Sequence, residues 1–127
     1  MDKKRILIVE DDADLASLMS DRLKSAGFFA EVAVDGEKAL EAMKNAPDLI
    51  LLDILLPKVD GLTVMRRVRG MDGWGSKVPI IIISNLTPDD NKVIHEISTG
   101  APVFYLVKAE HSLEEIVDKI KGVINPQ

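Results

Sequence analysis

The chain has 127 residues, of which 46% are hydrophobic, so it suits one compact domain with one core, over residues 1–127. Its net charge of −5, with acidic and basic residues interspersed, argues against sequence-independent binding to nucleic acid. The chain contains no cysteine, which excludes a disulfide framework and a thiolate metal site.

The first half of the chain alternates apolar runs with segments of helical period. Ile6–Val9 is short and purely apolar, as expected for a strand buried on both faces of a sheet. Phe28–Val34 is a more polar strand candidate that suits a sheet edge. Between and after them run helical stripes of Leu15, Leu18, Met19 and Leu23, then of Ala39, Leu40 and Met43. Gly27 falls where a helix end needs a left-handed residue, and Asp35 precedes the second helix as its cap.

The second half continues the same alternation. Leu49–Leu52, Ile80–Ile83 and Val103–Val107 are further candidates for buried strands. Three helical stripes separate and follow them: Leu62, Met65 and Val68; Val93, Ile94 and Ile97; and Leu113, Ile116, Val117, Ile120 and Ile124. The predicted order is therefore (βα)5, and right-handed crossovers then give a doubly wound, five-stranded parallel α/β sheet with helices on both faces.

Local signals agree with the helix boundaries in this half. Thr87 is the expected N-cap of the fourth helix, with Pro88 at its first position. Gly100 falls where that helix end needs a left-handed residue. Ser112 and Glu115 have the spacing of a capping box before the fifth helix.

Four of the apolar runs end in residues that phosphoryl chemistry can use. The first run leads into Glu10, Asp11 and Asp12, and the third strand candidate leads into Asp53. The next two lead into Ser84 and Lys108. The carboxyl ends of parallel strands lie side by side, at the edge where open α/β sheets place their ligands. We therefore expect these groups to converge on one site.

The acids of this cluster predict a metal site. Several carboxylates in a partly desolvated crevice repel one another unless a cation compensates their charge. Mg²⁺ suits a few carboxylates together with waters and a phosphate oxygen, so we expect Glu10 and Asp11 to bind it, directly or through water. Asp12 is instead expected to be a helix N-cap.

Asp53 stands alone after a buried run that requires no acid at its end. Its carboxylate is the expected nucleophile, accepting a phosphoryl group as an acyl phosphate. Phosphoryl transfer depends on positioning and on stabilising the charge of the equatorial oxygens. Mg²⁺, the Lys108 ammonium and the Ser84 hydroxyl supply three cations or donors for those oxygens.

From about Arg5 to Ile124, the chain resembles the receiver domain of bacterial two-component response regulators. The matching pieces are ILIVEDD (Ile6–Asp12), LILLD followed by LPKVDG (Leu49–Gly61), PIIIIS (Pro79–Ser84) and YLVK (Tyr105–Lys108). The resemblance implies a flavodoxin-like sheet with strand order 2-1-3-4-5. It also implies that Asp53 is phosphorylated, that Lys108 assists, and that Glu10, Asp11, Asp53 and the carbonyl of Leu55 hold Mg²⁺.

The family takes its phosphoryl group from a phosphohistidine of a sensor kinase or a phosphotransfer protein. By resemblance, Ser84 and Tyr105 are switch residues that remodel the face made by the fourth helix, the fifth strand and the fifth helix, where a downstream protein binds. The resemblance implies no enzymatic activity beyond self-phosphorylation and slow autodephosphorylation, and no direct contact with nucleic acid or membrane. It leaves open a phosphorylation-dependent dimer.

The chain departs from the family pattern at three places. Ala109 stands where the family usually has proline after a cis bond; a cis bond before a non-proline residue costs about 2.5–4 kcal/mol, so we expect a trans linkage. Asn85 stands where Ala or Gly is common, and its amide could restrict the attacking water or form a hydrogen bond near the site. Gly100–Tyr105 is one residue longer than the usual loop, which makes Phe104 the alternative to Tyr105.

Two other functions are weighed against the phosphoacceptor. A haloacid-dehalogenase-type phosphatase also uses an aspartyl nucleophile, but it needs a second Asp two residues later, where this chain has Leu55. A phosphorylation-independent interaction module usually lacks one of the acids or the lysine, and all are present here. Residues 70–77 nearly spell a phosphate-binding P-loop, but they follow a helix and enter a strand, the reverse of the required context.

Two further expectations concern the setting of the protein. No stretch approaches the roughly 20 apolar residues of a membrane span, and the first apolar run is too short for a signal peptide. We therefore expect a cytoplasmic protein. Met1 and the end of the chain soon after the last predicted helix favour a stand-alone protein over an excised domain.

Overall fold

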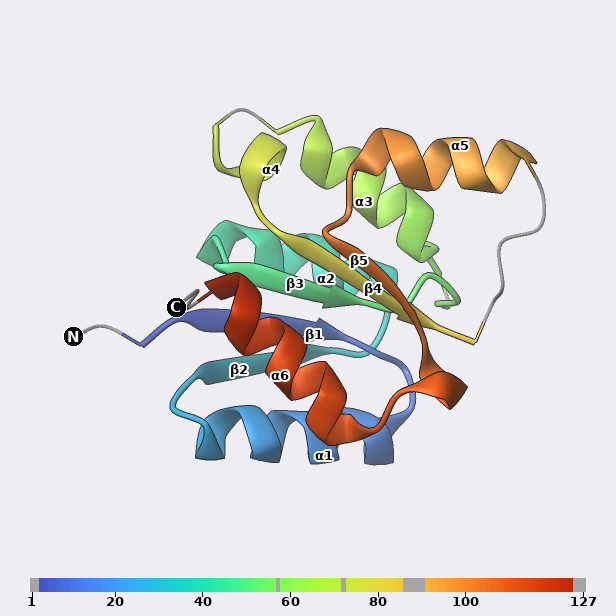
Figure 1. Ribbon diagram of the computed structural model, residues 1–127. Helices are drawn as coiled ribbons and strands as arrows, with labels where there is room; N and C mark the ends of the chain where they lie inside the picture. Colours follow the sequence, from blue (N-terminus) through green and yellow to red (C-terminus); the bar gives the residue numbers. More distant parts are fainter. Residues whose placement is uncertain (1–2, 57, 72, 86–90, 125–127) are drawn as a thin grey trace.

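The computed structural model describes residues 3–56, 58–71, 73–85 and 91–124 of the chain. Within them five parallel strands form one sheet in the order β2-β1-β3-β4-β5 (Figure 1). The strands are β1 (Arg5–Val9), β2 (Phe29–Ala33), β3 (Leu49–Leu52), β4 (Ile80–Ser84) and β5 (Phe104–Val107). The predicted fold class, strand order and edge position of the second strand are confirmed.

Helices cover both faces of this sheet. Those described are α1 (Ala13–Ser25), α2 (Gly36–Ala42), α3 (Gly61–Arg69), α4 (Trp74–Lys77), α5 (Asn91–Gly100) and α6 (Leu113–Ile124), with short 3₁₀ turns η1 (Met43–Asn45) and η2 (Lys108–Glu110). Figure 1 shows α1 and α6 together on one side of the sheet, while α2, α3 and α5 pack on the other. A parallel sheet with helices packed on both faces is a doubly wound fold.

Burial on both faces explains why the strand sequences are apolar without alternation. Ile6 and Ile8 of β1 join the core against α1 and α6, while Leu7 and Val9 join the core against α2 and α3. Their side chains are at most 1% exposed, and burying one such side chain contributes roughly 1.5–3 kcal/mol. The central strands β3 and β4 are fully buried in the same way.

The strand register brings the carboxyl ends together. Val9 of β1 lies beside Leu52 of β3, and Leu52 lies beside Ile82 of β4. Ser84, the last residue of β4, lies beside Val107, the last residue of β5. The residues that follow these ends therefore meet at one edge of the sheet, as the sequence predicts.

Most of the predicted helix caps are present. Asp12 accepts hydrogen bonds from the backbone N–H groups of the first turn of α1, and Asp35 caps α2. Ser112 and Glu115 bond each other's backbone N–H at 2.9 and 3.1 Å, which confirms the capping box. Gly27 has a positive φ of 96° and so takes the left-handed conformation predicted for it.

The expectation for Gly100 is wrong, because the left-handed residue at the end of α5 is Ala101, with φ 49°. Gly100 instead lies close against α3: a Cβ atom there would lie 2.2 Å from the terminal methyl carbon of Met65, so that side chain would have to move. The close packing of α5 on α3 therefore favours glycine at this position. The predicted caps Thr87 and Pro88 lie outside the described residues.

One helix was not foreseen from the sequence. Residues within the expected loop 70–77 form the single-turn helix α4, and its Trp74 Nε1 donates a hydrogen bond to the Pro47 carbonyl at 2.8 Å. Pro47 precedes β3, so this segment lies at the amino edge, away from the acids, as the P-loop argument required. The fourth and fifth helices expected from the sequence are thus α5 and α6.

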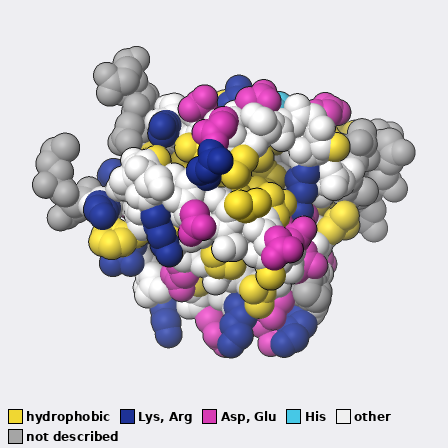
Figure 2. Space-filling view, turned by 90° about the horizontal axis from the view of Figure 1, so that it is seen from below, with side chains coloured by type: hydrophobic (Ala, Val, Ile, Leu, Met, Phe, Trp, Pro, Cys, Tyr) yellow, Lys and Arg dark blue, Asp and Glu magenta, His cyan; other side chains and the backbone are white. Residues whose placement is uncertain are grey.

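The face on the side of α1 carries mixed charge. Figure 2 shows acidic and basic side chains interspersed on it, with apolar side chains between them. The exposed apolar residues of this part of the chain include Leu18 of α1, Val32 of β2 and Val34 just after β2. Arg22 of α1 forms an ion pair with Glu114 of α6. Of the described helices, none combines the length and the apolar character that crossing a bilayer requires.

Candidate functional site

The groups predicted to converge at the carboxyl edge of the sheet do so. The Lys108 Nζ lies 2.6 Å from Glu10 Oε1 and 2.7 Å from Asp53 Oδ2. Lys108 follows β5, whereas Glu10 and Asp53 follow β1 and β3, so the lysine reaches across β4 to the centre of the sheet. One ammonium therefore forms ion pairs with two buried carboxylates from different strands and compensates one of their two negative charges.

Three carboxylates form a cluster that could hold a metal ion. Glu10, Asp11 and Asp53 each offer one oxygen, and these oxygens all lie within 4.8 Å of one another. Glu10 and Asp53 are buried, while Asp11 is exposed and leaves the cluster open to solvent. Hard oxygen ligands of this kind suit Mg²⁺, which keeps several waters of its own. The residues thus fit the ion that the sequence predicts.

The main chain around Asp53 holds its carboxylate in place. Its backbone N–H donates to the Val9 carbonyl at 3.0 Å, continuing the sheet by one residue beyond β3. Its Oδ1 accepts the backbone N–H of Leu55 at 3.0 Å, while Oδ2 faces Lys108. Gly61 allows the following loop to fold back closely, since a Cβ there would lie 2.4 Å from the Asp53 carbonyl oxygen.

Burial and the hydrogen bonds between Lys108 and the acids have opposite effects on the pKa values of Glu10 and Lys108. Desolvation by burial raises the pKa of Glu10, although hydrogen bonds from Lys108 and from the Asp12 backbone oppose the rise. Burial alone would lower the pKa of Lys108, but its hydrogen bonds to Asp53 and Glu10 outweigh that effect and raise it. Lys108 is therefore a permanent cation in this site at neutral pH.

Ser84 and Tyr105 lie together beside this cluster. Ser84 is fully buried at the end of β4. Burial raises the pKa of the Tyr105 hydroxyl, a side-chain hydrogen bond with Ser84 opposes the rise, and the charge of Asp53 adds to it. Tyr105 is partly buried against the α2–α3 core, whereas Phe104 lies on the opposite face with the Lys119 ammonium 4.8 Å from its ring centroid. Of the two aromatic candidates, Tyr105 is thus the one beside Ser84.

The two family departures nearest the site are joined by a hydrogen bond that the sequence did not reveal. The described residues contain no cis peptide bond, so the Lys108–Ala109 linkage is trans, as expected. The Ala109 N–H, which a proline would lack, donates to Asn85 Oδ1 at 3.0 Å. Of the two effects considered for the Asn85 amide, hydrogen bonding near the site is the one observed.

Leu55 lies on the loop after Asp53 with its side chain 54% exposed. Its backbone N–H is bonded to Asp53. Metal ligation by the Leu55 carbonyl stays a prediction.

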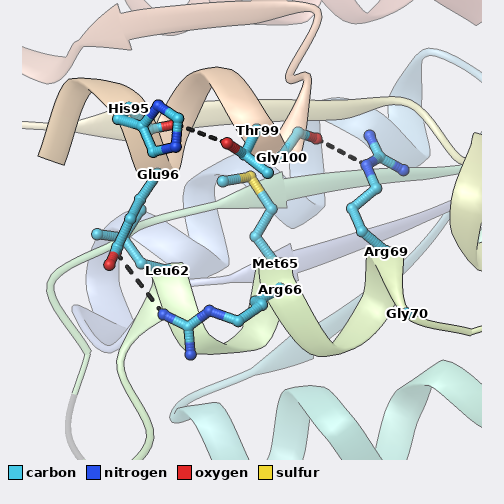
Figure 3. A pocket seen from close by; sticks show the side chains of 9 residues that line it. All are labelled: Leu62, Met65, Arg66, Arg69, Gly70, His95, Glu96, Thr99 and Gly100. Atoms are coloured by element: carbon cyan, nitrogen blue, oxygen red, sulfur yellow. Dashed lines mark hydrogen bonds and ion pairs between the residues drawn. The ribbon is translucent and has the colours of Figure 1, made fainter. Parts of the chain in front are cut away.

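A separate cavity of about 410 Å³ lies between α3 and α5, and none of the three clustered carboxylates lines it (Figure 3). Arg66 and Glu96 form an ion pair at 3.7 Å on its wall. Arg69, which the sequence analysis missed, donates to four main-chain carbonyls, those of Gly75, Val78, Gly100 and Ala101. Its guanidinium ties α3 to the ends of α4 and α5, a structural role that no local motif announces.

Comparison with known proteins identifies the kind of domain. The family model for the response regulator receiver domain matches residues 6–121. The transcriptional regulatory protein PrrA of Mycobacterium bovis is 37% identical over 121 residues, covering 94% of this chain and 49% of PrrA. The DNA-binding dual master transcriptional regulator RpaA of Synechocystis sp. is also 37% identical, over 94% of this chain and 48% of RpaA.

A solved structure of a putative response regulator from Chloroflexus aurantiacus matches with a TM-score of 0.81 and 30% identity, covering 97% of this chain and 98% of that one. The chain spans about half the length of the curated relatives it matches. Because RpaA is named a DNA-binding protein, the expectation of no direct contact with nucleic acid finds no support among these relatives.

Proposed function

Since this chain belongs to the response regulator receiver domain family, we propose that it acts as a phosphoacceptor of two-component signalling, with Asp53 as the residue that takes the phosphoryl group. The observation that carries the proposal is the setting of Asp53. Its buried carboxylate lies at the open carboxyl edge of the sheet, with an ammonium 2.7 Å away and two further carboxylates in reach.

In the proposed reaction a carboxylate oxygen of Asp53 attacks the phosphorus of a phosphohistidine. A carboxyl oxygen–phosphorus bond forms as the phosphorus–nitrogen bond breaks, and the imidazole leaves with the electron pair and is protonated from solvent. Lys108 balances the charge that spreads over the equatorial oxygens of the phosphoryl group, and it already lies against Asp53. The chain would catalyse only its own phosphorylation and slow dephosphorylation.

The acid cluster supports Mg²⁺ as the cofactor. Glu10, Asp11 and Asp53, with the carbonyl of Leu55, would hold the ion. When bound, it neutralises charge between the incoming phosphoryl group and the carboxylates. The burial of Glu10 and its bond from the Asp12 backbone fix one ligand in advance, while the exposed Asp11 keeps the site accessible from solvent.

Ser84 and Tyr105 are the proposed switch. A phosphoryl group on Asp53 offers the Ser84 hydroxyl a charged acceptor in place of Tyr105, and charge-assisted hydrogen bonds are the stronger ones. A shift of Ser84 then changes the position of Tyr105 and with it the face made by α5, β5 and α6. Ile94 and Val103, 41% and 45% exposed, supply apolar surface there for a downstream protein or for a phosphorylation-dependent dimer.

The proposed upstream partner is a sensor histidine kinase or a phosphotransfer protein. Because the relatives are named as transcriptional and DNA-binding regulators, the first downstream partner to test is a DNA-binding domain, either on the same polypeptide or on a separate protein. A cytoplasmic location stays a prediction from the sequence.

One experiment tests the proposal against its alternatives. The protein is incubated with Mg²⁺ and acetyl phosphate, and the intact mass of wild type is compared with that of Asp53→Asn. We expect a base-labile, acid-stable phosphoryl adduct on wild type alone. No adduct on wild type, or an equal one on the variant, would overturn the proposal. Rapid multiple turnover of phosphate esters would instead indicate the aspartyl phosphatase.

A further inference from the structure

Asn85 and Ala109 make a single side-chain bridge between two neighbouring segments of the site. Asn85 directly follows Ser84 at the end of β4, and Ala109 directly follows Lys108 after β5. The two strands run in register up to Ser84 and Val107. The bond from the Ala109 N–H to Asn85 Oδ1 at 3.0 Å therefore continues the connection of β4 and β5 just beyond their last backbone pair.

The bond lies in a short turn that holds Lys108 weakly by its own hydrogen bonds. Lys108 begins the 3₁₀ turn η2, and no side chain of the preceding residue caps that turn. The backbone bond that closes it, from His111 N to the Lys108 carbonyl, is long at 3.4 Å. Asn85 supplies an acceptor for the N–H of Ala109, the second residue of the turn, next to the residue whose ammonium must reach Glu10 and Asp53.

Position matters for Lys108 because it is a long and flexible side chain. A lysine loses much of its rotamer freedom when its side chain is fixed. The Lys108 ammonium makes ion pairs at 2.6 and 2.7 Å with two carboxylates that follow different strands. A backbone held in advance reduces the further ordering that these contacts demand.

We propose that Asn85 is a positioning residue for Lys108: through the Ala109 N–H it fixes the backbone from which the Lys108 ammonium reaches Asp53, and so speeds phosphoryl transfer. The inference rests on the proposed function of Asp53. It differs from the alternative in which the Asn85 side chain only blocks access to the site, because that effect would not pass through Lys108.

The first test measures the bond itself in the unphosphorylated, metal-free protein. Hydrogen exchange of the Ala109 amide is followed by NMR in wild type, Asn85→Ala and Asn85→Asp. A typical hydrogen bond contributes about 0.5–1.5 kcal/mol, so we expect Asn85→Ala to speed exchange roughly threefold to tenfold. Asn85→Asp keeps an acceptor of the same size and should retain the protection. Equal exchange in wild type and Asn85→Ala would overturn the inference.

The second test asks whether the effect passes through Lys108. The rate of adduct formation with acetyl phosphate and Mg²⁺ is measured for Asn85→Ala in the wild-type and in the Lys108→Met background. We expect a decrease of about threefold to tenfold with Lys108 present and no change without it. The same factor in both backgrounds, or faster modification of Asn85→Ala, would overturn the inference and favour the access effect.

Ala109 offers a matched control for the same cycle. Ala109→Pro removes the donor, so Asn85→Ala should have no further effect on the rate in that background, whereas Ala109→Ser keeps the N–H and should preserve the effect. If wild type forms the adduct but Asn85→Ala lowers the rate by the same factor in the Ala109→Pro background as in wild type, the positioning role alone would be overturned. No adduct on wild type would overturn the proposed function itself, and the positioning role with it.

Discussion

Replacing Lys108 with methionine tests the electrostatics of the site most sharply. The variant keeps a side chain of similar length but removes the ammonium that lies between Glu10 and Asp53. The side chains of these two acids are 0% and 5% exposed, so each would be left as a buried carboxylate without its cation. Removing one partner of a buried ion pair costs about 3–5 kcal/mol.

The lysine side chain is itself 18% exposed, and water can partly replace it. We therefore expect Lys108→Met to lower the free energy of unfolding by about 2–3 kcal/mol in metal-free buffer at neutral pH. With a urea m-value of about 2 kcal/mol/M, the midpoint should fall by about 1–1.5 M. The chain's single tryptophan, Trp74, is anchored at the opposite edge and gives a fluorescence readout. Added Mg²⁺ should stabilise the variant more than wild type, because wild type already holds a cation among the acids.

Lys58→Met is the matched control. Lys58 also pairs with two acids, Asp35 and Glu37, but at 3.7 and 4.0 Å and with its own side chain 57% exposed. Exposed pairs contribute about 0–1 kcal/mol, so this variant should shift the midpoint far less. Equal shifts in the two variants, or a change below about 0.5 kcal/mol for Lys108→Met, would refute the reasoning.

Further substitutions at four positions test the packing, the hydrogen bonds of Arg69 and the capping box. Gly100→Ala pushes a Cβ into the buried Met65 and should cost about 1–3 kcal/mol, measured by thermal unfolding; an unchanged midpoint would contradict that packing. Arg69→Lys should destabilise nearly as much as Arg69→Met, because an ammonium cannot serve four separate carbonyls; full rescue by lysine would show that charge alone matters. Ser112→Ala should cost about 1 kcal/mol. Hydrogen bonds from the backbone and side chain of Ser112 lower the pKa of Glu115 below its usual 4.5, so the charged Glu115 stabilises the fold above pH 4.5 and this stabilisation is lost as the pH falls through the lowered pKa. The difference in the free energy of unfolding between wild type and Glu115→Gln should therefore narrow below pH 4.5. A difference that widens there would contradict the cap.

The strand ends were predictable because a strand buried on both faces of the sheet needs an uninterrupted apolar run, and such a run can be recognised in the sequence itself. A run such as that of β3 carries no polar side chain, so Asp53 at its end stands out without any knowledge of the fold. The parallel sheet then places Glu10 and Lys108 at the same edge by topology alone. The family that these motifs suggested is confirmed by the match over residues 6–121.

The features that were missed depend on contacts between segments far apart in the chain. Arg69 has no periodic or motif context, and its partners come from α4 and α5. Gly100 was assigned a left-handed turn because glycine often ends helices, but the space left by Met65 is what favours it. The bond from Ala109 to Asn85 pairs two positions 24 residues apart. Of these residues, only Asn85 and Ala109 stood out in the sequence, as departures from the family pattern.

The identity of the modified residue tests the central claim most directly. After incubation with Mg²⁺ and acetyl phosphate, borohydride reduction converts an aspartyl phosphate to homoserine, which peptide mass spectrometry can locate. The account predicts homoserine at position 53 and at no other acid, with none in protein that received no phosphodonor. Homoserine at Asp11 or another aspartate, or its absence from a protein shown to carry the adduct, would contradict it.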